Sequence, residues 1–119
     1  MDRIITLPNG GELRLRATAL TPRLYRFKLG RDMIVDLNAL KKSYEKAGKA
    51  QDAQLTVTDL TIFENVAYIM AKQYDSTLPD TPEEWLDGLD GLFTVYEVLP
   101  DILELWQLNQ HTTSIPKKK

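Results

Sequence analysis

The side chains that could do chemistry in this chain are few, and they are poorly placed for catalysis. Cysteine is absent, and the single histidine, His111, lies in the polar ending "HTTSIPKKK". A catalytic histidine needs a group that orients it and a pocket that excludes water, and nothing near His111 in the sequence supplies either. The usual zinc ligands are missing as well. We therefore expect no catalytic residue, no metal site and no cofactor, and a protein that is not an enzyme.

The acidic run "DSTLPDTPEEWLDGLDG" is the next candidate for a site. A calcium-binding EF-hand loop needs oxygen ligands at alternate positions, a glycine at the sixth position and a glutamate at the twelfth. The run lacks this spacing, and acidic residues near the start of a helix complement the helix dipole. It is therefore interpreted as the solvated beginning of a helix. The segment "PNGGE" lacks the Lys and Ser or Thr that a phosphate-binding loop requires.

Basic side chains gather near the start of the chain, where aromatic residues interleave with them. The group consists of Arg14, Arg16, Arg23, Arg26, Lys28 and Arg31, with Tyr25 and Phe27 between its members. Such a mixture can bind nucleic acid, but domains that do so are usually strongly basic overall. This chain has a formal net charge of −2. A solvated strand face and helix flank therefore explain the group better than a nucleic-acid surface.

Length and composition restrict the class of protein. A chain of 119 residues with 43% hydrophobic residues fits one globular domain. No stretch approaches the ~20 apolar residues of a membrane helix, and the start "MDRIITLPNGG" lacks the apolar run of a signal peptide. We expect a cytoplasmic protein that does not bind a membrane. Residues 1–50 are net basic and residues 51–116 net acidic, so opposite charges attract within one fold or between neighbouring copies.

The hydrophobic pattern predicts a β-hairpin followed by four to five helices. Period-two alternation on both sides of "PNGG" indicates the hairpin. In "TPRLYRFKLG", Thr21 is the expected N-cap, Gly30 the stop, and Leu24 and Phe27 share a face. The next stripe consists of Met33, Leu37, Leu40 and Tyr44, and Gly48 is expected to end it.

The second half of the chain gives stronger helical signals. Thr58 is the expected N-cap of an apolar helix, with Val57 and Ile62 placed to staple its first turn. Thr81 and Glu84 predict a capping box for a short helix that follows. The last apolar face consists of Leu92, Val95, Tyr96, Leu99, Ile102, Leu103 and Trp106. Pro100 interrupts it, which indicates two helical pieces on one axis or a kink.

These elements predict a mainly α, small α+β fold. Residues 1–109 form a single helical domain with an N-terminal hairpin, and residues 110–119 form a flexible tail.

Two stretches resemble a known family. "TPRLYRFKLGRDMIVDLNAL" resembles the "rf-F-GRD" region near the start of small tail assembly chaperones from long-tailed (siphovirus-type) phages and prophages of Gram-positive bacteria. "FENVAYIMAKQYDSTLPDTPEEWLDGLDGLFTVYEVLPDILELW" is similar to the helical second half of that family, where an "A-Y-x-M-A" helix precedes "EEWL" and "VYEVLPxIxxLW". Together they cover just over half of the chain. Leu29 departs from the pattern, which has a second aromatic residue there.

The resemblance implies a function in virion morphogenesis without a reaction or a cofactor. Such chaperones bind the long helical tape measure protein, keep it soluble and help tail-tube subunits to gather round it. They act in the cytoplasm of the host bacterium and are absent from the mature virion. A ribosomal −1 frameshift near the end of the gene gives an extended form, which recruits the tail-tube protein.

The partner surface is expected on helical residues that do not all fit inward, and self-association is expected as well. The candidates are Trp85, Leu86, Leu89 and Phe93, together with Arg23, Arg26 and Arg31. Tryptophan and arginine are both frequent among binding hot spots. Two alternatives stay open: a small nucleic-acid-associated regulator that uses the basic N-terminal half, and another head or tail completion protein.

The three lysines of "SIPKKK" allow a direct test of the frameshift. Lysine codons are AAA or AAG, so codons 117–119 can form the adenine-rich track on which a ribosome slips. We expect sequencing of the gene to show this track followed by a long open −1 frame, and immunoblotting to show a second, larger product. If codons 117–119 contain no adenine run, or if the −1 frame stops immediately after them, the lysines only keep an exposed end soluble.

Overall fold

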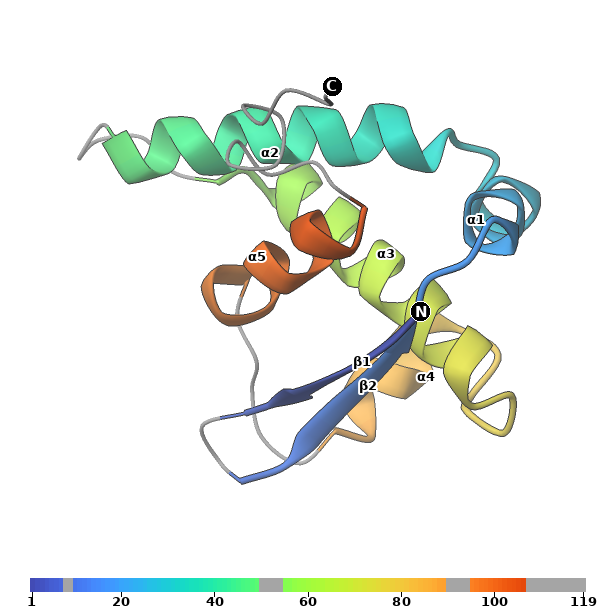
Figure 1. Ribbon diagram of the computed structural model, residues 1–119. Coiled ribbons are helices and arrows are strands. Elements are labelled where there is room, and N and C mark those ends of the chain that lie inside the picture. The colour runs from blue at the N-terminus through green and yellow to red at the C-terminus, as the bar shows by residue number, and fades with distance from the viewer. Residues whose placement is uncertain (8–9, 50–54, 90–94, 107–119) are drawn as a thin grey trace, which may run out of the picture.

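The computed structural model describes residues 1–7, 10–49, 55–89 and 95–106, and this part of the chain forms a hairpin followed by five helices (Figure 1). The elements are β1 (Asp2–Thr6), β2 (Glu12–Arg16), α1 (Leu20–Leu29), α2 (Met33–Lys49), α3 (Val57–Tyr74), α4 (Pro82–Asp87) and α5 (Val95–Leu105). The predicted fold class is confirmed. His111, the expected tail and the end of the expected domain lie outside the described residues.

The β-hairpin packs its apolar face on α3. Its strands are antiparallel, and Ile5 lies opposite Leu13. Ile5, Leu13 and Leu15 are buried, whereas Arg14 between the last two is exposed, so the predicted alternation is confirmed. Gly10 has a φ of 89°, a conformation that glycine adopts more readily than residues with a side chain. A glycine therefore suits position 10.

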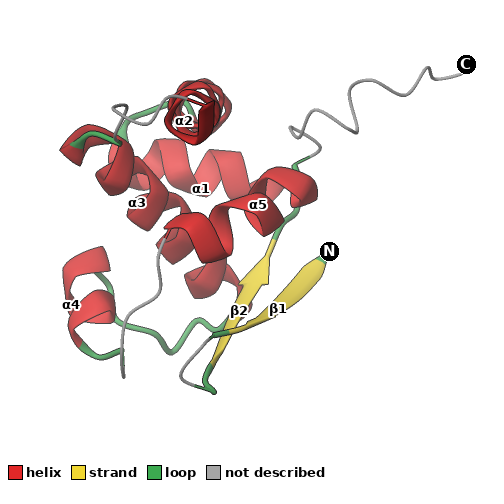
Figure 2. Cartoon of the chain, turned by 90° about the vertical axis from the view of Figure 1, so that its left-hand side faces the viewer, coloured by secondary structure: helices red, strands yellow, loops and turns green. Residues whose placement is uncertain are grey.

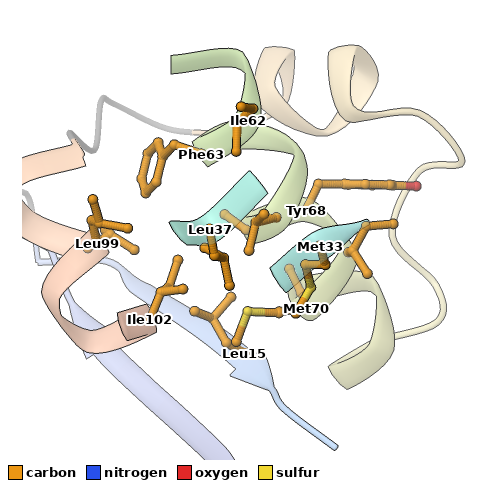
Figure 3. Packing of buried hydrophobic residues seen from close by; sticks show 14 of the residues in the cluster. Leu15, Met33, Leu37, Ile62, Phe63, Tyr68, Met70, Leu99 and Ile102 are labelled. Carbon is orange, nitrogen blue, oxygen red and sulfur yellow. The ribbon is translucent and has the colours of Figure 1, made fainter. Parts of the chain in front are cut away.

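The helix α3 is the centre of the fold. It lies between α2 on one side and the hairpin on the other, and α5 packs on it as well (Figures 1 and 2). Its buried apolar side chains are Ile62, Phe63, Val66, Ala67, Tyr68, Ile69, Met70 and Ala71. Leu15 of β2, Leu37 of α2 and Ile102 of α5 meet Met70 in one cluster (Figure 3). Burial of each large side chain contributes roughly 1.5–3 kcal/mol, so this cluster is the main source of stability.

The start of α3 differs from the prediction. Thr56, not Thr58, is the N-cap, and it forms a capping box with Asp59: the Asp59 N–H donates to the Thr56 hydroxyl at 3.0 Å, and the Thr56 N–H donates to the Asp59 carboxylate at 2.9 Å. Val57 is 80% exposed, so the expected staple with Ile62 does not form. Two backbone donors are satisfied by the box, which is why the earlier threonine is preferred.

Two further helix ends differ from the prediction. The helix α1 begins at Leu20, so Thr21 is not its N-cap. Thr21 is fully buried within the helix and donates its hydroxyl to Gln73 Oε1 of α3. The Thr18 hydroxyl instead accepts a hydrogen bond from the Leu20 N–H at 3.2 Å. The helix α2 continues past Gly48. A glycine weakens a helix by only about 1 kcal/mol, so it does not by itself end one.

The predicted cap of α4 is confirmed in its first half. Thr81 is the N-cap, and its hydroxyl accepts a hydrogen bond from the Glu84 N–H at 3.1 Å. The Glu84 carboxylate accepts a hydrogen bond from the Thr81 hydroxyl instead of from the Thr81 backbone. Pro82 stands at the first helical position, where its missing N–H costs nothing.

A buried carboxylate holds α1 against α2. Asp36 is 4% exposed and accepts hydrogen bonds from Arg31 Nε at 2.7 Å, Arg31 Nη2 at 2.8 Å and the Tyr25 hydroxyl at 2.8 Å. Gly30 ends α1 in the left-handed conformation, with a φ of 70°, as predicted. The bonds from Arg31 hold the pKa of Asp36 below its ordinary value of 3.8, and burial raises the pKa of Tyr25.

The helix α5 contains Pro100 and still keeps one face buried. Its buried side chains are Val98, Leu99, Ile102 and Leu103, and Pro100 is exposed. A proline leaves one carbonyl of the preceding turn without its N–H partner, and on the exposed side water can bond to that carbonyl. The predicted apolar face is confirmed over this stretch, and α5 is one helix.

Ion pairs connect the last helix to the first strand. Arg3 of β1 lies 2.7 Å from both Asp101 Oδ1 and Glu104 Oε1 of α5. These groups are partly exposed, so each pair is worth only about 0–1 kcal/mol. Together they hold α5 over the edge of the hairpin.

The Asp36 contacts make a prediction about stability and pH. We expect Asp36→Asn to lower the free energy of unfolding at pH 7 by about 1.5–3 kcal/mol, because charged hydrogen bonds are lost. The folded-state pKa of Asp36 is depressed, so its contribution is present above pH 3.8 and is lost as the pH falls through the lower folded value. Urea titrations of both proteins from pH 7 to pH 2 should therefore converge in strong acid.

Asp87→Asn is the matched control. Asp87 is exposed and has no ion pair within the described ranges. Its substitution should leave stability within about 0.5 kcal/mol of the original at every pH. Equal losses in the two variants would contradict a stabilising role for the buried carboxylate.

Candidate partner-binding groove

An open apolar groove lies where α1 packs against α3. Its volume is about 390 Å³. We call it the α1–α3 groove, and it is lined by Leu24, Phe27 and Lys28 of α1, by Tyr68, Ile69, Lys72 and Gln73 of α3, and by Ser76. The groove is large enough for a few apolar side chains and too small to enclose a whole helix.

Phe27 stands at the edge of the groove and is 90% exposed. Its direction follows from the other side of α1, where Thr21 and Tyr25 are fully buried one turn apart. Successive residues of a helix are rotated by about 100°, so Phe27 points away from the face that Tyr25 occupies. Leu20, seven residues before Phe27 on the same face, is 49% exposed. The helix α1 thus presents apolar side chains to solvent.

Tyr68 forms a rigid wall of the groove. Its ring centroid lies 5.7 Å from that of Trp85 in α4, and its hydroxyl donates to the Pro79 carbonyl, pointing away from the core cluster (Figure 3). Lys28 Nζ lies 5.9 Å from the centroid of the Tyr68 ring, within reach of a cation–π contact. Burial, followed by the charges of the nearby acidic residues Asp80 and Glu84, raises the pKa of Tyr68.

The polar groups of the groove already have partners within the chain. Lys72 Nζ donates to the carbonyls of Ser76 and Leu78 and lies 3.3 Å from Asp80 Oδ1. The Gln73 amide donates to Thr18 at 2.7 Å. What the groove offers a ligand is therefore mainly apolar surface, beside the charge of Lys28.

This arrangement is suited to binding apolar side chains. Lys72 and Ser76 both line the α1–α3 groove, and the Lys72 ammonium donates hydrogen bonds to the carbonyls of Ser76 and Leu78 and to Asp80. Over the residues that the structure describes, no three His, Cys, Asp or Glu side chains are grouped so that they could hold a metal ion.

The expected partner-binding residues do not all lie on one surface: Trp85 and Leu89 border one hollow, whereas Arg23, Arg26 and Arg31 belong to α1 and the turn after it. Trp85 is 4% exposed and packs against Tyr68, so it supports the groove from behind instead of meeting a partner directly. Leu86 and Leu89 are half-buried against the core. Phe93 lies outside the described residues.

A second hollow of about 310 Å³ borders Trp85 and Leu89. It is also lined by charged groups that already have partners: Arg14 pairs with Glu12 at 2.8 Å, and Asp75 accepts hydrogen bonds from Thr77. It offers less apolar surface than the α1–α3 groove.

The three expected arginines have different roles. Arg31 is paired with Asp36 and holds α1 against α2, as described above. Arg23 and Arg26 are exposed on α1, the helix that carries Phe27. Leu24 and Phe27 share a face, as predicted, but sequence reasoning did not identify that face as the open one. The sequence signal that could have indicated an open face is that this ten-residue helix combines Leu24 and Phe27 with three cations and contains no acidic residue.

Comparison with known proteins identifies no relative of this chain. No family model, no curated protein and no solved structure matches it. No helix in the described segments is both long enough and apolar enough to cross a membrane.

Trp85 and Phe27 form a matched pair for testing the groove. We expect Trp85→Ala to lower the free energy of unfolding by about 3–5 kcal/mol, because a large buried side chain is lost. Phe27→Ala should change it by less than about 0.5 kcal/mol, because Phe27 is exposed. Urea denaturation measures both values. Similar losses in the two variants would show that Phe27 is part of the core.

Proposed function

We propose that this protein is a phage tail assembly chaperone, which binds the tape measure protein, keeps it soluble and promotes assembly of the tail tube. The observation that carries the proposal is the open α1–α3 groove with Phe27 at its edge. Several large apolar side chains are exposed among the described residues, Val57 at 80% included, but Phe27 is the most exposed of them at 90% and stands beside an apolar groove, as expected of an interaction site.

The groove fits the chemistry of a long helical partner. Such a partner exposes an apolar stripe that aggregates unless it is covered. The α1–α3 groove could receive a few side chains of the stripe, in the manner of a helix bound in a groove. One contact of this size is weak. Several copies of the chaperone along one rod would together bind more strongly, because their local concentration is high.

The motifs that resemble the chaperone family support the same surface. In "GRD", Gly30 turns the chain and Arg31 pairs with Asp36, which holds α1 in place. In "EEWL", Trp85 packs behind Tyr68, which is a wall of the groove. The motif residues thus position the groove, although they are not its exposed part.

The remaining features of the proposal follow from the family resemblance. The chaperone acts in the host cytoplasm and associates with itself on the tape measure protein. A −1 frameshift gives an extended form, and the extension recruits the tail-tube protein. The folded domain and the extension then act as one tethered adaptor.

A nucleic-acid-associated regulator is the second candidate function, because Arg23, Arg26 and Lys28 are exposed together on α1. Binding through phosphate contacts weakens steeply as salt rises, since counterions are released. Binding of an apolar stripe persists at high salt. A titration from about 50 to 500 mM salt therefore separates the two functions.

Co-expression tests the chaperone function directly. The partner is the very long helical protein that we expect the neighbouring gene to encode. The original chaperone should keep this protein in the soluble fraction and co-purify with it. Phe27→Ser should reduce both effects strongly, because the apolar contact is lost while the fold is kept.

Val57→Ser is the matched control. Val57 is 80% exposed, and about 18 Å of helix separates it from Ile69 in the groove. This variant should behave like the original protein. If the partner stays insoluble with the original chaperone, the proposed function is wrong. If Phe27→Ser and Val57→Ser are equally active, the groove is not the binding site.

A further inference from the structure

The arginines divide into paired and unpaired residues, and the unpaired ones lie on α1, the helix that carries Phe27. Four of the six arginines form ion pairs with carboxylates: Arg3 with Asp101 and Glu104, Arg14 with Glu12, Arg16 with Asp2, and Arg31 with Asp36. Arg23 and Arg26 have no ion pair with any residue that the structure describes. Both are exposed on α1.

The position of Arg23 has no structural explanation. Arg26 and Lys28 lie in the last turn of α1, where a positive charge interacts favourably with the helix dipole. Arg23 is the fourth residue of the same helix, near its positive end, where a positive charge is unfavourable. The helix contains no acidic residue that could offset this effect. The positive charge of Arg23 therefore slightly destabilises the isolated protein and is available to bind another molecule.

Arg23 and Phe27 are neighbours on the helix surface. Residues four positions apart lie on one face, with Cβ atoms about 5–6 Å apart. Lys28 borders the groove on the other side of Phe27, above the Tyr68 ring. The exposed apolar edge therefore lies between two positive charges that carboxylates within the described residues do not neutralise.

We infer that the α1–α3 groove selects an amphipathic helix that carries acidic side chains beside its apolar stripe. The apolar residues of this helix enter the groove next to Phe27, and its carboxylates pair with Arg23 and Lys28. This inference rests on the proposed function, because it states the chemistry of the tape measure segment that is bound. The observation that points to this occupant is the positive charge of Arg23 and Lys28 beside Phe27, which a partner's carboxylates would complement.

A protein helix fits this surface better than nucleic acid. The space between the cations is lined by Leu24 and Ile69, which offer nothing to a phosphate. Lys72, the other cation of the groove, is held by two carbonyls and by Asp80. An apolar side chain, by contrast, can use both the aliphatic lining and the Phe27 ring.

Two synthetic peptides of about 20 residues test the inference, since this length is sufficient for a helix to form. Both have the same leucine stripe; one has glutamates beside it, and the other has lysines at the same places. Titration by fluorescence anisotropy should show that the glutamate peptide binds about tenfold more tightly or better. Arg23→Glu should remove most of this preference, because Lys28 is then the main cation left to pair with a glutamate of the peptide and the introduced carboxylate repels that glutamate.

A melting-temperature measurement separates a role of Arg23 in binding from a role in holding the fold together. Arg23→Glu places an anion near the positive end of α1, so its melting temperature should be unchanged or higher. A residue that only held the fold together would lower the melting temperature when replaced. Lys42→Glu is the control, because it makes the same change of charge at an exposed site on α2 that has no ion pair among the described residues. It should leave the preference between the peptides unchanged.

The possible outcomes are distinct. Equal binding of the two peptides, or an equal effect of Arg23→Glu and Lys42→Glu, would overturn the inference. It would also be overturned if a single-stranded DNA of about 20 nucleotides bound more tightly than the glutamate peptide and Phe27→Ser did not weaken that binding. If the tape measure protein is kept soluble but the peptides bind equally, the proposed function stands and only the acidic selection fails. If the glutamate peptide is selected but the tape measure protein stays insoluble, the groove has the inferred chemistry and a different helical partner.

Discussion

The need to cover α3 determines the arrangement of this protein. Its apolar side chains point in several directions, so a single neighbouring helix cannot shield them. The hairpin, α2, α4, α5 and α1 all contact it, and each takes its place by burying part of that surface (Figure 1). Burial of apolar area is the dominant favourable contribution to folding. The α1–α3 groove lies where this covering is incomplete, and a binding site there requires no separate scaffold.

Polar contacts decide which side of α1 faces inward. Thr21 donates a hydrogen bond to Gln73, and Tyr25 donates one to the buried Asp36. A buried hydroxyl without a partner costs about 1–3 kcal/mol, so these groups favour the inner face once their partners are present. The apolar residues on the other side, Phe27 among them, are then left outside. The contacts that hold α1 against α2 and α3 therefore also leave Phe27 exposed at the edge of the α1–α3 groove.

Features that depend only on the residues of one helix or hairpin could be predicted from the sequence. The hairpin alternation and the apolar stripe of α5 are of this kind. The N-cap of α3 was also readable, because Asp59 follows Thr56 at the spacing of a capping box, whereas Thr58 lacks such a partner. The groove was not readable in this way. Leu24 and Phe27 share a face whether it is buried or open, and only contacts with other helices decide between the two.

The ion pairs between Arg3 and α5 have a consequence for the order in which the chain folds. Arg3 and Asp101 are 98 positions apart in the sequence. The first strand is therefore synthesised long before its partner helix, which carries the buried side chain of Ile102. Contacts of such long range raise the contact order and slow folding. The growing chain therefore keeps part of its apolar interior open to solvent until α5 closes over it.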